Sequence, residues 1–101
     1  MNDTRTKDLP DNVLLVGGKD FSSYMRTIEF FIRKQKKKKI IIKARGNNIK
    51  KAIDLAEASK NKFLNDLDIL IKDVKIYTSK FNDKENIERS VSCIDIEIFL
   101  K

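Results

Sequence analysis

Apolar positions along this chain switch several times between the spacing of strands and the spacing of helices. The apolar run at 13–16, which a pair of glycines ends, predicts a short strand that is buried on both faces. Apolar residues then recur three and four positions apart over 21–32, directly after Asp20, which is a candidate helix N-cap. This second pattern predicts an amphipathic helix of about 14 residues.

The middle of the chain repeats this order of strand and helix. A β-branched run at 40–42, which follows four lysines at 36–39, predicts a second strand that ends near Gly46. Asn47 or Asn48 is then expected to cap a second helix. Small alanines on the apolar face of that helix indicate close packing against a sheet.

The last third of the chain shows the period of two that is typical of strands. The alternation over 67–71 shifts by one position before it resumes over 74–78, which indicates a β-bulge near residues 72–73. Residues 79–89 are polar and predict a turn, and a closing strand follows over 93–100.

The predicted element order is therefore β-α-β-α-β-β, without an internal repeat. It indicates an α+β domain of two layers, in which two helices cover one face of a mixed four-stranded sheet. A length of 101 residues fits one such domain. The domain is expected over residues 12–101, after a polar stretch at 1–11 that contains the only proline and predicts a flexible tail.

The charge of the chain indicates a polyanionic partner. The net charge is +7, and residues 33–51 hold ten basic residues and no acidic one, whereas the rest of the chain is slightly acidic. Nucleic acid is the first candidate partner and an anionic membrane the second. The alternative is that lysine is common here for compositional reasons and that part of the surplus is solvated surface.

The residue inventory excludes several classes of protein. Without histidine and with one cysteine, the chain cannot build a structural zinc site, a Ser-His or Cys-His catalytic pair or an internal disulfide, and no metal or cofactor is expected. Cys93 shares a strand face with carboxylates and is expected to be a partly covered free thiol. Since no apolar run approaches the ~18 residues of a membrane span and no signal peptide is recognisable, an intracellular, soluble protein is expected.

The order of the elements gathers three loops at one edge of the sheet. Right-handed crossovers make the first three strands parallel, so the loops after them, at 17–20, 45–48 and 79–89, emerge together. Glycines in the first two loops let a phosphate approach the backbone, and helix N-termini offer free N–H groups. The candidate nucleic-acid-binding residues are Lys19, Lys43, Arg45, Gly46, Asn47, Asn48, Lys50, Lys51, Lys80, Lys84 and Arg89.

Simpler interpretations of these loops stay open. The glycines can serve tight turns alone, and the long loop at 79–89 is either an arm or a solvated loop. The four lysines at 36–39 are expected at the opposite edge, as a secondary contact or a solvated turn. The sequence Gly-Gly-Lys at 17–19 lacks the spacing of a P-loop, so nucleotide hydrolysis is not indicated.

Three segments carry a family likeness. Residues 12–19 read Asn-Val-Leu-Leu-Val-Gly-Gly-Lys, residues 43–46 read Lys-Ala-Arg-Gly after an isoleucine strand, and an alanine-rich helix follows over 49–57. Through these segments the chain resembles the Alba family over about residues 12–101. The resemblance implies homodimers that bind double-stranded DNA and RNA with little sequence preference, a hairpin arm that follows the minor groove, and roles in chromatin or ribonucleoprotein.

The resemblance also assigns roles to single residues. Lys19 matches a lysine of the family's basic loop, and Arg45 begins its Arg-Gly pair, whereas Asn47 stands where another basic residue is common. The family's acetylation switch, which implies a deacetylase partner, acts at a lysine whose place Gly18 takes here. Phe63 matches an aromatic residue that joins dimers side by side, and the alternative is that it packs into the core.

Other functions are weaker candidates. Relatives of this fold serve as structural subunits of RNase P or MRP-like ribonucleoproteins, which is the main alternative. A nuclease that uses a lysine Schiff base or a carboxylate-bound Mg²⁺ is conceivable, but no spacing selects a residue for either reaction. A membrane-surface protein is least favoured, because neither helix combines a basic face with exposed large apolar residues. The sequence leaves open the preference for DNA or RNA and the compartment, whether nucleus, cytoplasm or nucleoid.

Overall fold

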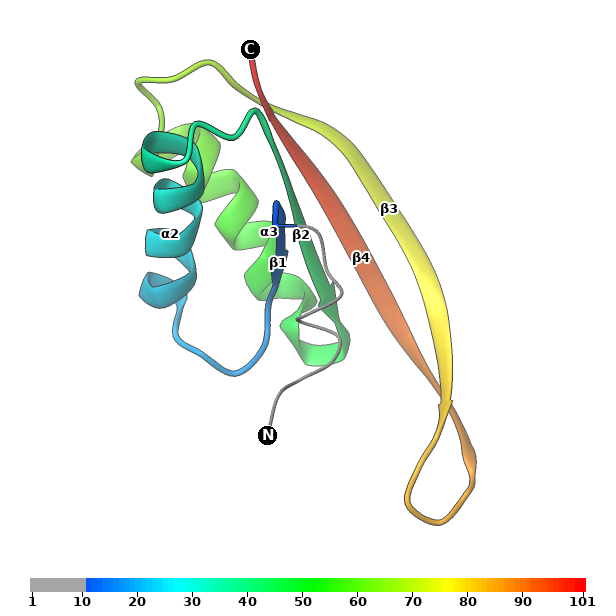
Figure 1. The fold of residues 1–101 in the computed structure, drawn as a ribbon. Coiled ribbons are helices and arrows are strands. Elements are labelled where there is room, and N and C mark those ends of the chain that lie inside the picture. The colour runs from blue at the N-terminus through cyan, green and yellow to red at the C-terminus, as the bar shows by residue number, and fades with distance from the viewer. Residues whose placement is uncertain (1–10) are drawn as a thin grey trace.

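A computed structural model describes residues 11–101 and confirms the predicted α+β domain of two layers. Both helices lie on one face of a four-stranded sheet, and the last two strands extend beyond the body (Figure 1). The predicted tail at 1–11 lies outside the described residues except for Asp11. The elements are β1 (Val13–Leu15), α2 (Phe21–Glu29) with a π-helical turn (Phe30–Lys34), β2 (Lys39–Arg45), a 3-10 turn (Gly46–Asn48), α3 (Ile49–Ala58) with a π-helical turn (Ser59–Phe63), β3 (Ile69–Asn82) and β4 (Glu88–Leu100).

The sheet has the strand order β1-β2-β4-β3. β1 pairs with β2 in parallel, and β4 pairs antiparallel with both β2 and β3. β1, β2 and β3 consequently run in the same direction, as predicted, although β4 separates β3 from the other two. The loops after these three strands emerge at the lower end of Figure 1, and the turn that holds residues 36–38 lies at the upper end.

The core lies between the helices and the sheet face formed by β2 and β4. Ile42 and Ile98 are almost fully buried there, together with Ile28 of α2. Burial of one such side chain stabilises the fold by about 1.5–3 kcal/mol. Ala52 and Ala56 are also buried, so α3 approaches the sheet closely, as its small residues predicted.

The first helix confirms its predicted start and length. The Asp20 carboxylate accepts a hydrogen bond from the backbone N–H of Ser23 at 3.0 Å. That hydrogen bond is the main reason why the pKa of Asp20 lies below its ordinary value. The prediction that Asn47 or Asn48 caps the second helix is wrong: Asn48 has helical backbone angles and makes no capping hydrogen bond, because a 3-10 turn leads into α3 instead.

Two predictions about the strands need correction. β1 is an edge strand in which only Leu14 is buried, because nothing pairs with its outer side in the sheet of the described residues. Cys93 is buried rather than partly covered, since β2 and β3 flank it on both sides. The predicted bulge is confirmed by a register shift between Ile71 and Asp73.

The segment at 79–89 is mostly strand and not the turn that was predicted. β3 continues to Asn82 and β4 begins at Glu88, so only 83–87 form the turn. Phe81 and Ile87 are about half exposed and do not pack down onto the body. The result is a two-stranded arm that lengthens the molecule to 49 Å (Figure 1).

Candidate nucleic-acid interface

The loop edge, which we define as Lys19, Arg45 and the 3-10 turn at Gly46–Asn48, lies where β1 and β2 end. Parallel pairing of Leu15 with Lys43 brings the two loops side by side. Lys19 and Arg45 are exposed, and no acidic side chain of residues 11–101 forms an ion pair with either. Both cations are therefore available to an anionic ligand.

Two side chains that the sequence analysis did not recognise as supports fix the loop after β1. The buried Tyr24 hydroxyl accepts hydrogen bonds from the backbone N–H groups of Gly17 at 2.6 Å and Lys19 at 3.3 Å. Lys51 Nζ donates to the carbonyl oxygens of the same two residues, at 2.9 and 2.8 Å. Lys51 was predicted to contact nucleic acid, but its ammonium group is engaged in holding this loop.

Gly46 gives the second loop its shape. Its φ is +59°, in the left-handed region that other residues adopt at a cost. A Cβ at this position would also lie 3.3 Å from a methyl carbon of Val91. This glycine directly follows Arg45, so it sets the direction in which the chain leaves β2 beside that cation.

Two further lysines of the predicted site already have acidic partners. Lys43 Nζ lies 2.7 Å from Asp95 Oδ2, and Lys50 Nζ lies 2.8 Å from Asp54 Oδ2. These hydrogen bonds raise the pKa of both lysines. Their charge is partly compensated, so each contributes less to binding an anion than its sequence position suggested.

The arm carries the remaining predicted cations. Lys80, Lys84 and Arg89 are exposed on it, and Arg89 Nε donates to Asp83 Oδ2 at 2.8 Å. Asp83 also accepts from the backbone N–H groups of Ile87 and Glu85, at 3.0 and 2.9 Å. The pKa of Asp83 lies below its ordinary value, mainly because of the hydrogen bond from Ile87 and secondly because of the one from Arg89. One carboxylate thus organises the tip of the arm.

The four-lysine turn, residues 36–39, lies at the far end of the sheet, as predicted (Figure 1). Lys36 has a φ of +59°, an uncommon conformation for a residue with a side chain. Lys37 Nζ lies 3.1 Å from Asp11 Oδ2. The body of the domain separates this turn from the loop edge.

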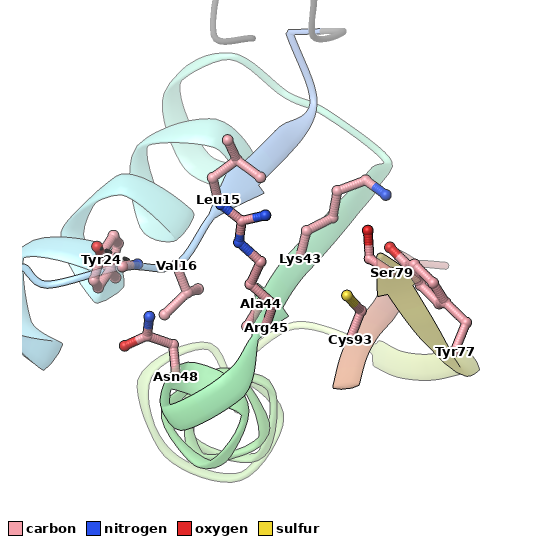
Figure 2. Close-up of a pocket in the computed structure, with 11 residues that line it drawn as sticks. Leu15, Val16, Tyr24, Lys43, Ala44, Arg45, Asn48, Tyr77, Ser79 and Cys93 are labelled. Atoms are coloured by element: carbon pink, nitrogen blue, oxygen red, sulfur yellow. Dashed lines mark hydrogen bonds between the residues drawn. The ribbon is translucent and has the colours of Figure 1, made fainter. Parts of the chain in front are cut away.

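A groove of about 460 Å³ opens beside the loop edge. It begins at the ends of β1 and β2 and continues over the sheet face that the helices leave uncovered. Figure 2 shows Arg45 on one side of it, Tyr77 and Ser79 on the other, and Cys93 between them.

Two apolar regions remain exposed elsewhere. Phe63 is 40% exposed at the end of the π-helical turn that follows α3, so its alternative role in the core is wrong. Val74 and Ile76 of β3 are 50% and 79% exposed on the helix side of the sheet, and Ile53 of α3 is 39% exposed. An apolar groove of about 300 Å³ lies among Ile53, Ala56, Glu57, Ile71, Val74, Ile94 and Ile96.

Within residues 11–101, no three acidic or cysteine side chains lie close enough together to hold a metal ion. No helix in the same part of the chain is long and apolar enough to cross a membrane.

Comparison with known proteins gives one consistent result. The family model described as Alba matches residues 12–78. The chain is 36% identical to the DNA/RNA-binding protein Alba of Methanothrix thermoacetophila over 86 residues, which cover 85% of this chain and 92% of that protein. It is 34% identical to the protein of the same name from Picrophilus torridus, over the same fractions of the two chains.

Solved structures agree with the sequence comparisons. Alba from Thermoplasma volcanium superimposes with a TM-score of 0.77 and 31% identity, covering 87% of this chain and 99% of that one. ALBA1 from Trypanosoma brucei gives a TM-score of 0.66 at 21% identity, covering 92% of this chain and 72% of that one, which shows a shared fold.

Proposed function

This chain belongs to the Alba family, and from that premise we propose that it binds the backbone of double-stranded DNA and RNA with little sequence preference and catalyses no reaction. The observation that carries the proposal is the loop edge, where two cations without an acidic partner among residues 11–101 stand beside the glycine loops. Such an arrangement binds phosphates by charge, which does not read base sequence, while the N–H groups of Gly17 and Lys19 already donate to Tyr24.

Salt titration tests this proposal. If a dimer neutralises about 5 phosphates, the logarithm of the association constant for duplex DNA should fall against log salt with a slope near −4 to −5. Equilibrium binding to several unrelated duplexes measures both the slope and the sequence dependence. A slope near zero, or a strong preference for one duplex, contradicts the proposal.

We also propose that the protein acts inside the cell as a homodimer. Val74 and Ile76 lie on the helix side of β3, and Ile53 of α3 borders the same groove, so the two helices of the chain leave this apolar surface exposed. A second copy would remove this surface from water and double the number of cations on one ligand.

Sedimentation tests the dimer. The protein should sediment at twice 11.8 kDa at tens of micromolar, and Ile76→Asp should produce the monomer because a charge would be buried in the interface. Ile87→Asp is the matched control, since Ile87 is also exposed but lies at the tip of the arm. A wild-type monomer, or an Ile76→Asp dimer, contradicts this assignment.

Phe63 is proposed to join neighbouring dimers on a nucleic acid. Its exposure at the end of the π-helical turn that follows α3 fits contact with another molecule. Phe63→Ala should leave the dimer intact and reduce the cooperativity of DNA coating, measured by titrating duplexes of increasing length. Unchanged cooperativity would remove Phe63 from the assembly.

A further inference from the structure

The uncovered face of the sheet contains a trough whose floor is Cys93. In the strand register, Cys93 pairs with Arg45 of β2 on one side and with Tyr77 of β3 on the other. Neighbouring strands are about 4.8 Å apart, so the backbones at Arg45 and Tyr77 are about 9.6 Å apart, with one small side chain between them. Figure 2 shows the three residues in this order.

One wall of the trough is the aromatic ring of Tyr77. Tyr77 is 46% exposed, and its hydroxyl donates to Asp95 Oδ1 at 2.9 Å. Lys43 binds the other oxygen of the same carboxylate, so Asp95 is held from both sides. The tyrosine ring is thereby held in place while a large part of it stays uncovered. Arg45 stands on the other side of Cys93, and Figure 2 shows its guanidinium group beside Leu15 of β1.

The chemistry of the trough suits a base better than a phosphate. Asp95 is a carboxylate and offsets the charge of Lys43, which weakens attraction for an anion at this end. Aromatic rings and guanidinium planes stack on nucleobases, and the Ser79 hydroxyl beside the trough can bond to a base edge. A base that is paired inside a duplex cannot enter, because its faces are already stacked.

We propose that the trough formed by Arg45, Cys93 and Tyr77 binds one unpaired nucleobase of a single-stranded RNA or DNA. The inference rests on the proposed nucleic-acid binding and adds a second mode to it. Arg45 belongs to both the loop edge and the trough, so a strand whose phosphate lies at the loop edge places the adjoining base within reach of Tyr77.

The experiment measures affinity at about 0.15 M salt for four ligands. They are oligo(dT) and oligo(rU) of about 12 nucleotides, an abasic deoxyribose strand of the same length, and a duplex. The variants are Tyr77→Leu, which removes the ring, and Tyr77→Phe, which keeps it. Phe30→Leu is the matched control, because Phe30 is an equally exposed aromatic residue at the end of α2, away from the trough.

Tyr77→Leu should weaken binding of the base-containing single strands by about 10-fold. It should change the affinity for the abasic strand and for the duplex by less than about 2-fold, because their contacts are to phosphates. Tyr77→Phe and Phe30→Leu should bind like the wild type. A loss confined to oligo(rU) or to oligo(dT) supports the trough and assigns it to RNA or to DNA.

Two results would overturn the inference. One is a Tyr77→Leu variant that binds all single strands as the wild type does, and the other is an equal loss on the abasic strand. A wild-type protein that binds the duplex but prefers no base-containing strand over the abasic one also overturns it, and leaves the proposed function standing. Failure of the wild type to bind any of the four ligands overturns the proposed function itself.

Discussion

The two ends of the sheet both carry clustered cations, and they differ in how the chain holds them. At the loop edge, Tyr24 and Lys51 fix the backbone around Lys19, and a glycine takes up the left-handed conformation after Arg45. At the four-lysine turn, Lys36 takes the left-handed conformation, and the backbone N–H groups of Lys37 and Leu100 donate to carbonyl oxygens that hold the turn, at 3.0 and 2.8 Å. The proposed binding edge therefore differs from the four-lysine turn in the glycines beside its cations, whereas the four-lysine turn has the larger number of charges.

The sharpest way to break this comparison is to remove each cluster in turn. Lys19→Ala with Arg45→Ala removes two charges per protomer and should weaken duplex binding at 0.15 M salt by roughly 100-fold, with a flatter salt slope. Gln at all four positions 36–39 removes four charges and should cost less than about 5-fold, mainly through slower association. Equilibrium titration and stopped-flow kinetics separate the two effects. Greater damage in the four-lysine variant would assign binding to the other end.

Backbone conformation gives the next largest expected effect. Gly46→Ala should destabilise the protein by about 1–2 kcal/mol, because a side chain is costly at a φ of +59°. Lys36→Gly should instead stabilise it by about 0.5 kcal/mol, since it relieves the same cost at the other turn. Urea unfolding at one fixed protein concentration measures both changes. Shifts of the same sign would show that the two turns are not strained in the way described.

Substitution of Lys51 tests whether its hydrogen bonds fix the backbone of the loop at 17–19. Lys51→Met should cost about 1 kcal/mol of stability and speed amide exchange in the loop at 17–19, because two carbonyl oxygens lose their donor. Lys50→Met is the matched control: it removes the same charge from the neighbouring position, where the pair with Asp54 is exposed. Hydrogen exchange compares the two variants. Equal amide exchange at 17–19 in the two variants would show that Lys51 does not fix this loop.

The smallest expected effect concerns the tip of the arm. Hydrogen bonds from Ile87 and Arg89 lower the pKa of Asp83, so its contribution to stability is complete above the unfolded value of 3.8 and is lost as the pH falls below it. Amide resonances of residues 83–87 should therefore change below about pH 4 while the body remains folded. Asp83→Asn should abolish this titration. An unchanged acid transition in that variant would assign it to another group.

Much of the fold follows from the sequence because local patterns report local structure. Asp20 capped its helix as predicted, and the one-position shift of the apolar alternation marked the bulge beside Asp73. The length of the arm was missed because residues 79–89 are mostly polar and none of them is fully buried. A period of two is visible only where one face is apolar.

The site was harder to predict, because its decisive contacts join residues that are distant in sequence. Lys43 meets Asp95 across 52 positions, and Lys51 meets the carbonyl oxygen of Gly17 across 34. No local pattern distinguishes these lysines from Lys19, which has no acidic partner among residues 11–101. The sequence could name the basic candidates, whereas only the fold shows which of them already bind an acidic side chain or a backbone carbonyl oxygen.

The most direct test of the account is the backbone amide spectrum of the protein during titration with a DNA duplex. The account predicts that the largest chemical-shift changes fall on the loop edge, at Lys19, Arg45 and the turn Gly46–Asn48, followed by the arm. Amides of the four-lysine turn should change little at the same saturation. If the changes concentrate at residues 36–39 and spare the loop edge, the binding surface lies at the other end of the sheet and the account is wrong.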